Sequence, residues 1–151
     1  MGIEAKDFGE RLVSLLPQLM KEISRYENNY VTSGKITCQQ FLVLEQVSQK
    51  PQWKMNELVQ VMDTSFSSTT EMLDRLDKHG LVQRIRGEED RRTVFVKVTR
   101  KGHKILEEIY DQKKEGIVEL FKRLNSSERA DYLRIIEKLV QSLSSVKGES
   151  R

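Results

Sequence analysis

The sequence predicts a mainly α-helical fold with a small β-wing, in which long helices from both ends of the chain flank a compact centre. Three observations predict it. The 151 residues include only 2 prolines and 8 glycines, so long helices are permitted and a sandwich of many short strands is disfavoured. Apolar residues recur every three or four positions towards both ends of the chain. The centre, residues 55–99, passes from helical spacing to the alternation of two short strands.

Composition narrows the class of protein. Charged residues make up 32% of the chain, and no apolar run approaches the roughly 18 residues that a membrane span requires. The first residues contain acids and no apolar stretch, which argues against a signal peptide. A single cysteine rules out an intramolecular disulfide framework. We therefore expect a cytoplasmic protein with no membrane partner.

Two helices are expected before the centre. Apolar positions predict a long amphipathic helix over residues 7–30, which Pro17 should kink. A second helix should run from Thr37, as its N-cap, to Ser48. Trp53 is expected where a short strand meets the next helix.

The centre then begins with two short helices joined by Asp63-Thr64, a spacing typical of a helix-turn-helix. Ser65 is the expected N-cap of the second helix, so short hydroxyl side chains fall in its first turn and a half. Recognition helices present their N-terminal residues to DNA base edges, and short hydroxyls can bond bases or phosphates. Arg75, two turns beyond Ser68, can reach the DNA backbone. The predicted contacts on this helix are Ser65, Ser67, Ser68, Thr69, Thr70 and Arg75. For any one hydroxyl, simple helix capping is an equal alternative.

A β-hairpin should follow as the wing, with strands at residues 81–85 and 93–98. Its loop is too charged to belong to a core. Arginine suits a narrow minor groove with its strong negative potential, which makes Arg86, Arg91 and Arg92 the expected wing contacts.

The acids of this loop are expected to serve another purpose. Asp90 should order the loop by pairing with an arginine, while Glu88 and Glu89 should point away from phosphates. Residues 75–104 carry a net charge of +6, although the whole chain carries only +3. Such a concentration of positive charge is the footprint expected of phosphate contact. A solvated charged face is the alternative.

After the wing, Thr99 is the expected N-cap of a helix that runs to about Arg123, and Asn125 and Glu128 form a capping box for a last helix. With the first helix, these give three apolar stripes of about 20 residues each, more than the centre can cover. Such arms usually bury their faces against a second copy, although a monomeric bundle is an alternative. The expected organisation is a helical dimerisation region (1–36 and 100–145), a winged helix-turn-helix lobe (37–99) and a flexible tail (146–151).

These motifs together resemble the MarR family of bacterial winged helix-turn-helix transcriptional regulators. Asp90-Arg91-Arg92, followed by alternating valines and Thr99-x-x-Gly102, is similar to the family's wing signature. Leu73-Asp-Arg-Leu76 with Gly80-Leu-Val82-x-Arg84, and Ile36-Thr37-x-x-Gln40-Phe41-x-x-Leu44, are also similar. The resemblance covers essentially the whole chain. Departures lie at Asp63-Thr64, where members often have Gly-Val, and at Glu71, where many carry arginine.

The resemblance implies a homodimer that binds double-stranded DNA at a pseudo-palindromic operator, and repression relieved by a small ligand or an oxidant. Carried onto this sequence, it makes Ser65, Ser67, Ser68 and Thr70 major-groove contacts. Arg75 becomes a backbone contact, and Arg91 or Arg92 the wing contacts. The expected function is therefore that of a dimeric DNA-binding regulator, most simply a repressor released by a small ligand.

Candidate switch residues are few. Met20, Tyr26, Tyr30 and Tyr110 could line a ligand cleft between the helical arms and the central lobe, although such residues are more often core. Cys38, in the first turn of a helix, is a conceivable redox sensor, with a half-buried inert thiol as the alternative. No residue spacing indicates a metal, a cofactor or a catalytic set, so we expect no enzyme. A winged-helix module for protein–protein assembly is the other function considered.

Overall fold

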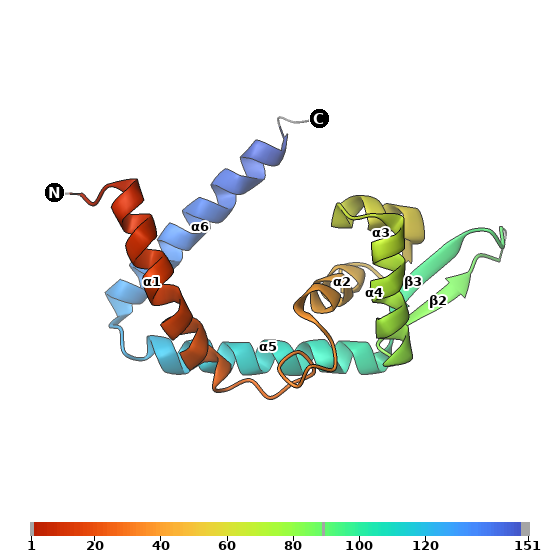
Figure 1. The fold of residues 1–151 in the computed structure, drawn as a ribbon, viewed down its shortest axis with the longest axis horizontal. Coiled ribbons are helices and arrows are strands. Elements are labelled where there is room, and N and C mark those ends of the chain that lie inside the picture. The colour runs from red at the N-terminus through yellow and green to blue at the C-terminus, as the bar shows by residue number, and fades with distance from the viewer. Residues whose placement is uncertain (1, 89, 149–151) are drawn as a thin grey trace.

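The structure, a computed structural model that describes residues 2–88 and 90–148, is an elongated, mainly helical molecule (Figure 1). A small lobe containing the sheet lies at one end, and two long helices project from the other. The elements in chain order are α1 (Ala5–Ser24), α2 (Cys38–Ser48), β1 (Trp53–Lys54), α3 (Met55–Met62), α4 (Phe66–Lys78), β2 (Val82–Arg86), β3 (Val94–Val98), α5 (Arg100–Phe121) and α6 (Ser126–Gly148). The predicted fold class is confirmed.

The lobe is built on an antiparallel sheet in the order β1-β3-β2. The wing strands pair from Val82 opposite Val98 to Arg86 opposite Val94, and Trp53 of β1 pairs with Val96. Helices α2, α3 and α4 and the first half of α5 pack around this sheet. Their buried side chains form one core: Ile36, Phe41, Val43, Leu44, Val47, Trp53, Met55, Leu58, Leu73, Leu76, Leu81, Val82, Val96, Ile105, Leu106 and Ile109.

Local capping chemistry sets the helix starts, as the sequence predicts. The Thr37 hydroxyl accepts from the Gln40 amide, and the Gln40 side chain accepts in return from the Thr37 backbone. Thr99 caps α5 by accepting from Gly102 N–H. Asn125 and Glu128 form the predicted reciprocal capping box before α6. Each cap satisfies backbone N–H groups that have no partner within the helix.

Gly102 explains the Thr-x-x-Gly spacing at the end of the wing. A Cβ atom there would collide with the carbonyl oxygen of Leu81 and approach Val98 Cγ1 to 2.6 Å. The hydroxyl of Thr99, the residue immediately before α5, donates to the Gly80 carbonyl oxygen at 2.6 Å. Glycine and threonine together therefore let α5 start in direct contact with the base of the wing.

α1 ends at Ser24, so the prediction of a helix over residues 7–30 is wrong beyond that point. The segment after the helix is organised by Asn29, which is buried and accepts through Oδ1 from the backbone N–H groups of Val31 and Thr32. Asparagine side chains that bond nearby backbone compete with helical hydrogen bonds. Its Nδ2 donates at 3.0 Å to Gln112 on α5, which anchors the segment.

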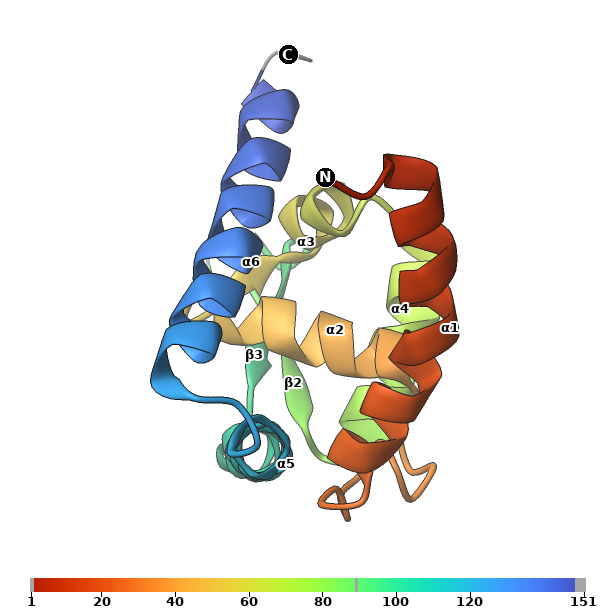
Figure 2. The same ribbon diagram turned by 90° about the vertical axis from the view of Figure 1, so that its left-hand side faces the viewer.

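The arms lie across α5, which Figure 2 shows end-on with α1 and α6 on either side. None of the residues of α1 is buried, and Leu15 of α1 and Leu139 of α6 expose 51% and 55% of their surface. Within one chain, these stripes are left uncovered, as predicted. Within the predicted tail, residues 146–148 continue α6, and residues 149–151 lie outside the described structure. None of the helices described is both long and apolar enough to cross a membrane.

Candidate nucleic-acid interface

A tight turn sets the angle between α3 and α4. Asp63 adopts a left-handed backbone conformation (φ 50°), which aspartate tolerates better than most residues. The Thr64 and Thr69 hydroxyls are hydrogen-bonded at 2.6 Å, which closes the turn against α4. The predicted two-residue link is confirmed, and it directs the N-terminus of α4 out of the lobe.

The hydroxyl side chains at the start of α4 fall into different environments. Ser65 is the predicted N-cap, and its Oγ accepts from Ser68 N–H at 3.0 Å and donates to Ser68 Oγ at 2.8 Å. Thr70 donates to the Phe66 carbonyl oxygen at 2.8 Å. Ser67 is exposed, and its hydroxyl makes no hydrogen bond within the described part of the chain. Among Ser65, Ser67, Ser68 and Thr70, only Ser67 therefore has a hydroxyl that makes no hydrogen bond within the described part of the chain.

Thr69 corrects the predicted set of DNA contacts. Its side chain is fully buried, and its hydroxyl donates at 3.1 Å to the Ser65 carbonyl oxygen. A side chain in this position packs α4 onto the core and cannot meet a base edge. The spacing held the signal that was missed: Thr69 precedes Leu73 by four residues and Leu76 by seven, so it lies on the face of α4 that these leucines bury.

Charged side chains occupy the outer face of α4 beyond the hydroxyls. Arg75 is exposed, as a DNA contact requires, and its Nη2 lies 3.6 Å from Glu71 Oε1 one turn earlier. Lys78 continues the exposed face at the end of the helix. The exposed surface of α4 therefore carries both signs of charge, with the cations nearer its C-terminal end.

Arg84, on β2, is a residue whose role was missed by sequence reasoning. Its Nη1 lies 2.5 Å from Asp74 Oδ1, and its Nη2 donates to the Thr70 carbonyl oxygen at 3.0 Å. The contact ties the first wing strand to the middle of α4. A pair between a helix and a strand ten residues later has no local sequence signature, although Arg84 belongs to the motif Gly80-Leu-Val82-x-Arg84.

The wing loop is ordered by Asp90, but not through the predicted arginine. Asp90 Oδ1 accepts from the backbone N–H of Arg92 at 2.9 Å, and Oδ2 accepts from the Thr93 hydroxyl at 3.2 Å. Because Asp90 bonds the backbone, the guanidinium groups around it are not tied to this carboxylate. The predicted wing contacts Arg86, Arg91 and Arg92 are all exposed. Glu88 is exposed as well, while Glu89 lies outside the described residues.

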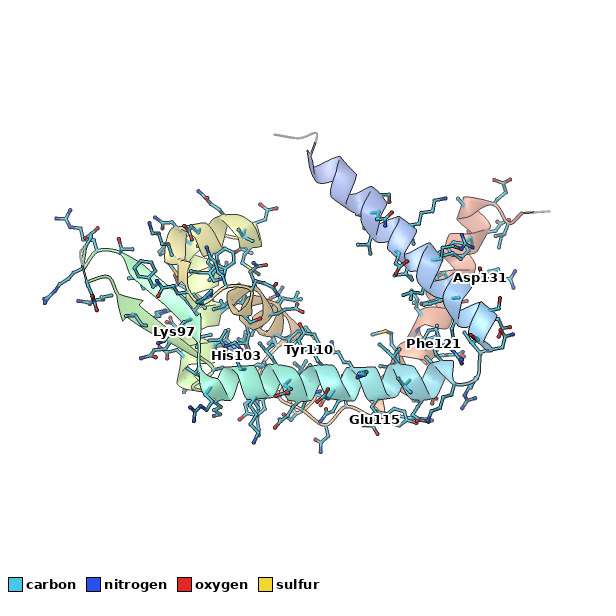
Figure 3. All side chains as sticks on the ribbon, turned by 180° about the vertical axis from the view of Figure 1, so that it is seen from behind. Lys97, His103, Tyr110, Glu115, Phe121 and Asp131 are labelled. Carbon is cyan, nitrogen blue, oxygen red and sulfur yellow. The ribbon has the colours of Figure 1, made fainter. Side chains whose placement is uncertain are left out.

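The four residues predicted to line a ligand cleft are dispersed. Met20 and Tyr26 are exposed on and just after α1. Tyr30 packs against the lobe core, with its ring edge-to-face to His79. Tyr110 lies on the side of α5 that faces α2 and donates to the Glu45 carboxylate (Figure 3).

An apolar pocket lies elsewhere, between α1, α5 and α6. Its volume is about 620 Å³, and the rings of Phe121 and Tyr132 meet in its wall at a tilt of 54°, with centroids 4.9 Å apart. None of the four predicted cleft residues lines it. The residues that do are Ile23, Ile117, Val118, Phe121, Lys122, Arg129, Tyr132 and Leu133.

The other candidate reactive groups are isolated. Cys38, the one cysteine in the sequence, is exposed at the first position of α2, where the sequence alternative was a half-buried thiol. Across residues 2–88 and 90–148, no three His, Cys, Asp or Glu side chains gather so that they could hold a metal ion.

Comparison with known proteins identifies the family. The family model described as MarR family matches residues 36–94, the lobe from α2 to the start of β3. The multiple antibiotic resistance protein MarR of Salmonella typhimurium is 30% identical over 127 residues, which cover 83% of this chain and 88% of that protein. An uncharacterized HTH-type transcriptional regulator of Bacillus subtilis, YpoP, is 28% identical over 126 residues, 83% of this chain and 89% of its own.

A solved structure extends the likeness to the whole fold. A cysteine-to-serine mutant of MarR from E. coli, crystallised with operator DNA, superposes with a TM-score of 0.58 at 28% identity. The match covers 91% of this chain and 99% of that one. The motifs of the wing and α4, the arrangement of the helices and these relatives agree: the chain belongs to the MarR family of transcriptional regulators.

Proposed function

We propose that this regulator acts as a homodimeric repressor that binds a pseudo-palindromic operator and is released by a small ligand. The observation that carries the proposal is the joint exposure of α4 and the wing on one lobe. The start of α4 carries exposed Ser67, and the wing carries three exposed arginines, one at the end of β2 and two in the loop. One rigid lobe thus offers a helix for the major groove and cations for the flanking minor groove.

The residues have separable tasks in this proposal. Ser67 reaches base edges, while Ser65, Ser68 and Thr70 bring the helix close to the backbone. Arg75 contacts phosphate. Arg86, Arg91 and Arg92 meet the minor groove or the phosphates beside it. Arg84 holds the wing and α4 at a fixed angle through Asp74.

Dimerisation is supported by the apolar faces of the arms. Leu12, Leu16 and Leu19 of α1 are exposed along one side of the helix. On α6, Leu133, Ile136 and Leu143 are exposed in the same way. Covering such residues contributes about 25 cal/mol per Å² of apolar surface removed from water. A symmetric dimer would present two α4 helices, so we expect half-sites separated by about one turn of DNA or a multiple of it.

Release by a small ligand is supported by the pocket between α1, α5 and α6. Its volume of about 620 Å³ falls within the range of known ligand sites. The same helices form the proposed dimer arms, so a bound compound would change how the two lobes are spaced. A compound library tested for displacement of bound DNA would identify such ligands, and repetition with an oxidant would test the alternative switch through Cys38.

The decisive experiment is selection of genomic fragments bound by the purified protein, followed by footprinting. We expect a two-fold symmetric protected site and an affinity that falls steeply with salt, because bound phosphates release counterions. A protein–protein assembly module would show neither. A footprint over one half-site per dimer would contradict the symmetric arrangement.

A further inference from the structure

We propose that Glu71 is a specificity-determining residue of the DNA interface, and that its carboxylate selects a cytosine in each half-site. The inference rests on the proposed function and deepens it. It concerns the one acid at the centre of the outward face of α4, a place where a negative charge needs an explanation.

The position of Glu71 follows from the packing of α4. Thr69, Leu73 and Leu76 are fully buried and define the inward face. With 3.6 residues per turn, Glu71 lies about 160° around the helix from that face, one turn after the exposed Ser67. Its side chain is 72% exposed. If α4 enters the major groove, this carboxylate meets the base edges.

A carboxylate in that groove is repelled by phosphates unless donors compensate. Arg75 supplies part of the compensation, since its Nη2 lies 3.6 Å from Glu71 Oε1. Both side chains are largely exposed, so this ion pair contributes little in isolation. Its use is to hold the carboxylate along the helix, while other N–H groups of the guanidinium remain available to phosphate.

The chemistry of the base edges then selects one partner. In the major groove, cytosine presents the N4 amino donor, while adenine presents its N6 donor beside the N7 acceptor. A carboxylate has no hydrogen for N7, and the two would repel each other. Guanine and thymine present acceptors on this edge. Cytosine is therefore the base that an ionised Glu71 fits.

The neighbouring hydroxyls are less able to discriminate. The Thr70 hydroxyl donates to the Phe66 carbonyl oxygen, and the Ser65 hydroxyl donates to Ser68 Oγ. A hydroxyl can also act as donor or acceptor, so it accepts several bases. The acceptor-only carboxylate is the more selective group on this face.

The test is selection from randomised duplexes by the full chain, carried out for the wild type, Glu71→Gln and Glu71→Ala. An amide suits adenine, because it can donate to N7 and accept from N6. We expect one position per half-site to change from cytosine to adenine in Glu71→Gln and to lose its preference in Glu71→Ala. The wild type should discriminate against the wrong base there by about tenfold or more.

Asp77→Asn is the matched control, because it removes the same charge from an exposed position later on α4. It should tighten binding to all sequences slightly and leave the preferred site unchanged. If Glu71→Gln, like Asp77→Asn, leaves the preferred base at every position unchanged, Glu71 does not determine specificity and the inference is wrong. If the wild type shows no sequence preference at all, the proposed function itself fails. Circular dichroism of each variant checks that the fold is kept.

Discussion

The hydroxyl of Tyr110 is the clearest single-residue link between α5 and the lobe. It donates to the Glu45 carboxylate of α2, while Phe41 of α2 lies edge-to-face with its ring at 6.2 Å. Partial burial, followed by the hydrogen bond and the charge of Glu45, raises the pKa of Tyr110 to about 12. The contact thus favours the neutral phenol, and it lies where the arm meets the DNA-binding lobe.

A tyrosinate titration followed by absorbance should detect this contact. Because the folded pKa is raised above the ordinary value near 10, the stabilisation is complete below about pH 10 and is lost as pH rises through about 12. We expect the wild type to contain one late-titrating tyrosine that is missing from Tyr110→Phe. Tyr26→Phe is the control, and it should leave the late step in place. Loss of the late step in the control instead would refute the assignment.

Among the wing residues, Arg92 gives the simplest test of DNA contact. Its backbone N–H is bound by Asp90, which fixes the loop, while its side chain is exposed. Arg92→Ala should weaken operator binding by about 1–3 kcal/mol and leave the dimer folded. Titration of labelled operator with the protein at fixed salt measures this loss of affinity. Arg123→Ala, which removes an exposed arginine just after α5, should bind normally; equal affinity for both variants would overturn the wing assignment.

At the residue scale, sequence reasoning was reliable where the chemistry was local. Thr37, Ser65 and Thr99 were predicted as N-caps, and the structure confirms all three. Each hydroxyl accepts a hydrogen bond from the backbone N–H three residues later. The partners of Asp90 depend on the path of the wing loop. Its residue type indicated a contact with an arginine, but only the fold could show that the contact is with the Arg92 backbone and the Thr93 hydroxyl.

At the scale of elements, the crossing of α1 over α5 depends on Gly116. A Cβ atom at this position would lie 2.7 Å from the Ile23 carbonyl oxygen and 3.2 Å from Ile23 Cγ2. The backbones of the two helices therefore approach more closely than any larger residue permits. Ile23 lies near the C-terminal end of α1, so Gly116 fixes the point at which α1 crosses α5.

Gly116→Ala should destabilise the protein by about 1–3 kcal/mol, although alanine is the better helix former, because the methyl group must push α1 away. Gly9→Ala is the matched control within α1, since no atom lies within 4 Å of its added Cβ. That variant should gain about 0.5–1 kcal/mol from helix propensity. Chemical denaturation of both measures the difference; equal shifts of the same sign would show that the crossing tolerates a methyl group.

Element boundaries show where periodicity stops being informative. The apolar spacing of residues 7–30 continues past Ser24, so it could not reveal that Asn29 turns the chain inward to meet Gln112. The same limit applies to the C-terminus, where polar residues suggested a tail and α6 continues to Gly148. Strand β1 and the wing were easier, because Trp53 and the alternating valines are marked in the sequence.

For the whole molecule, the exposed arms predict that oligomeric state controls DNA binding. Leu139→Lys places a charge on the apolar stripe of α6 and should yield monomers in analytical ultracentrifugation. Operator affinity should fall with it, because each lobe must then bind its half-site without a linked neighbour. Val61→Lys alters an equally exposed apolar residue of α3 in the lobe and should remain dimeric. A Leu139→Lys dimer of normal affinity would exclude this face.

The length of α5 has a mechanical consequence. From Arg100 at the base of the wing to Gly116 at the crossing with α1, the helix extends about 24 Å. The first half of the helix is part of the lobe core, so a tilt at the arms would move the lobe, and α4 with it. A tilt of about 8° at the Gly116 crossing would displace the wing end of the helix by about 3 Å, close to the rise of one base pair. If α4 binds a half-site as proposed, a tilt of this size would move it out of register with that half-site.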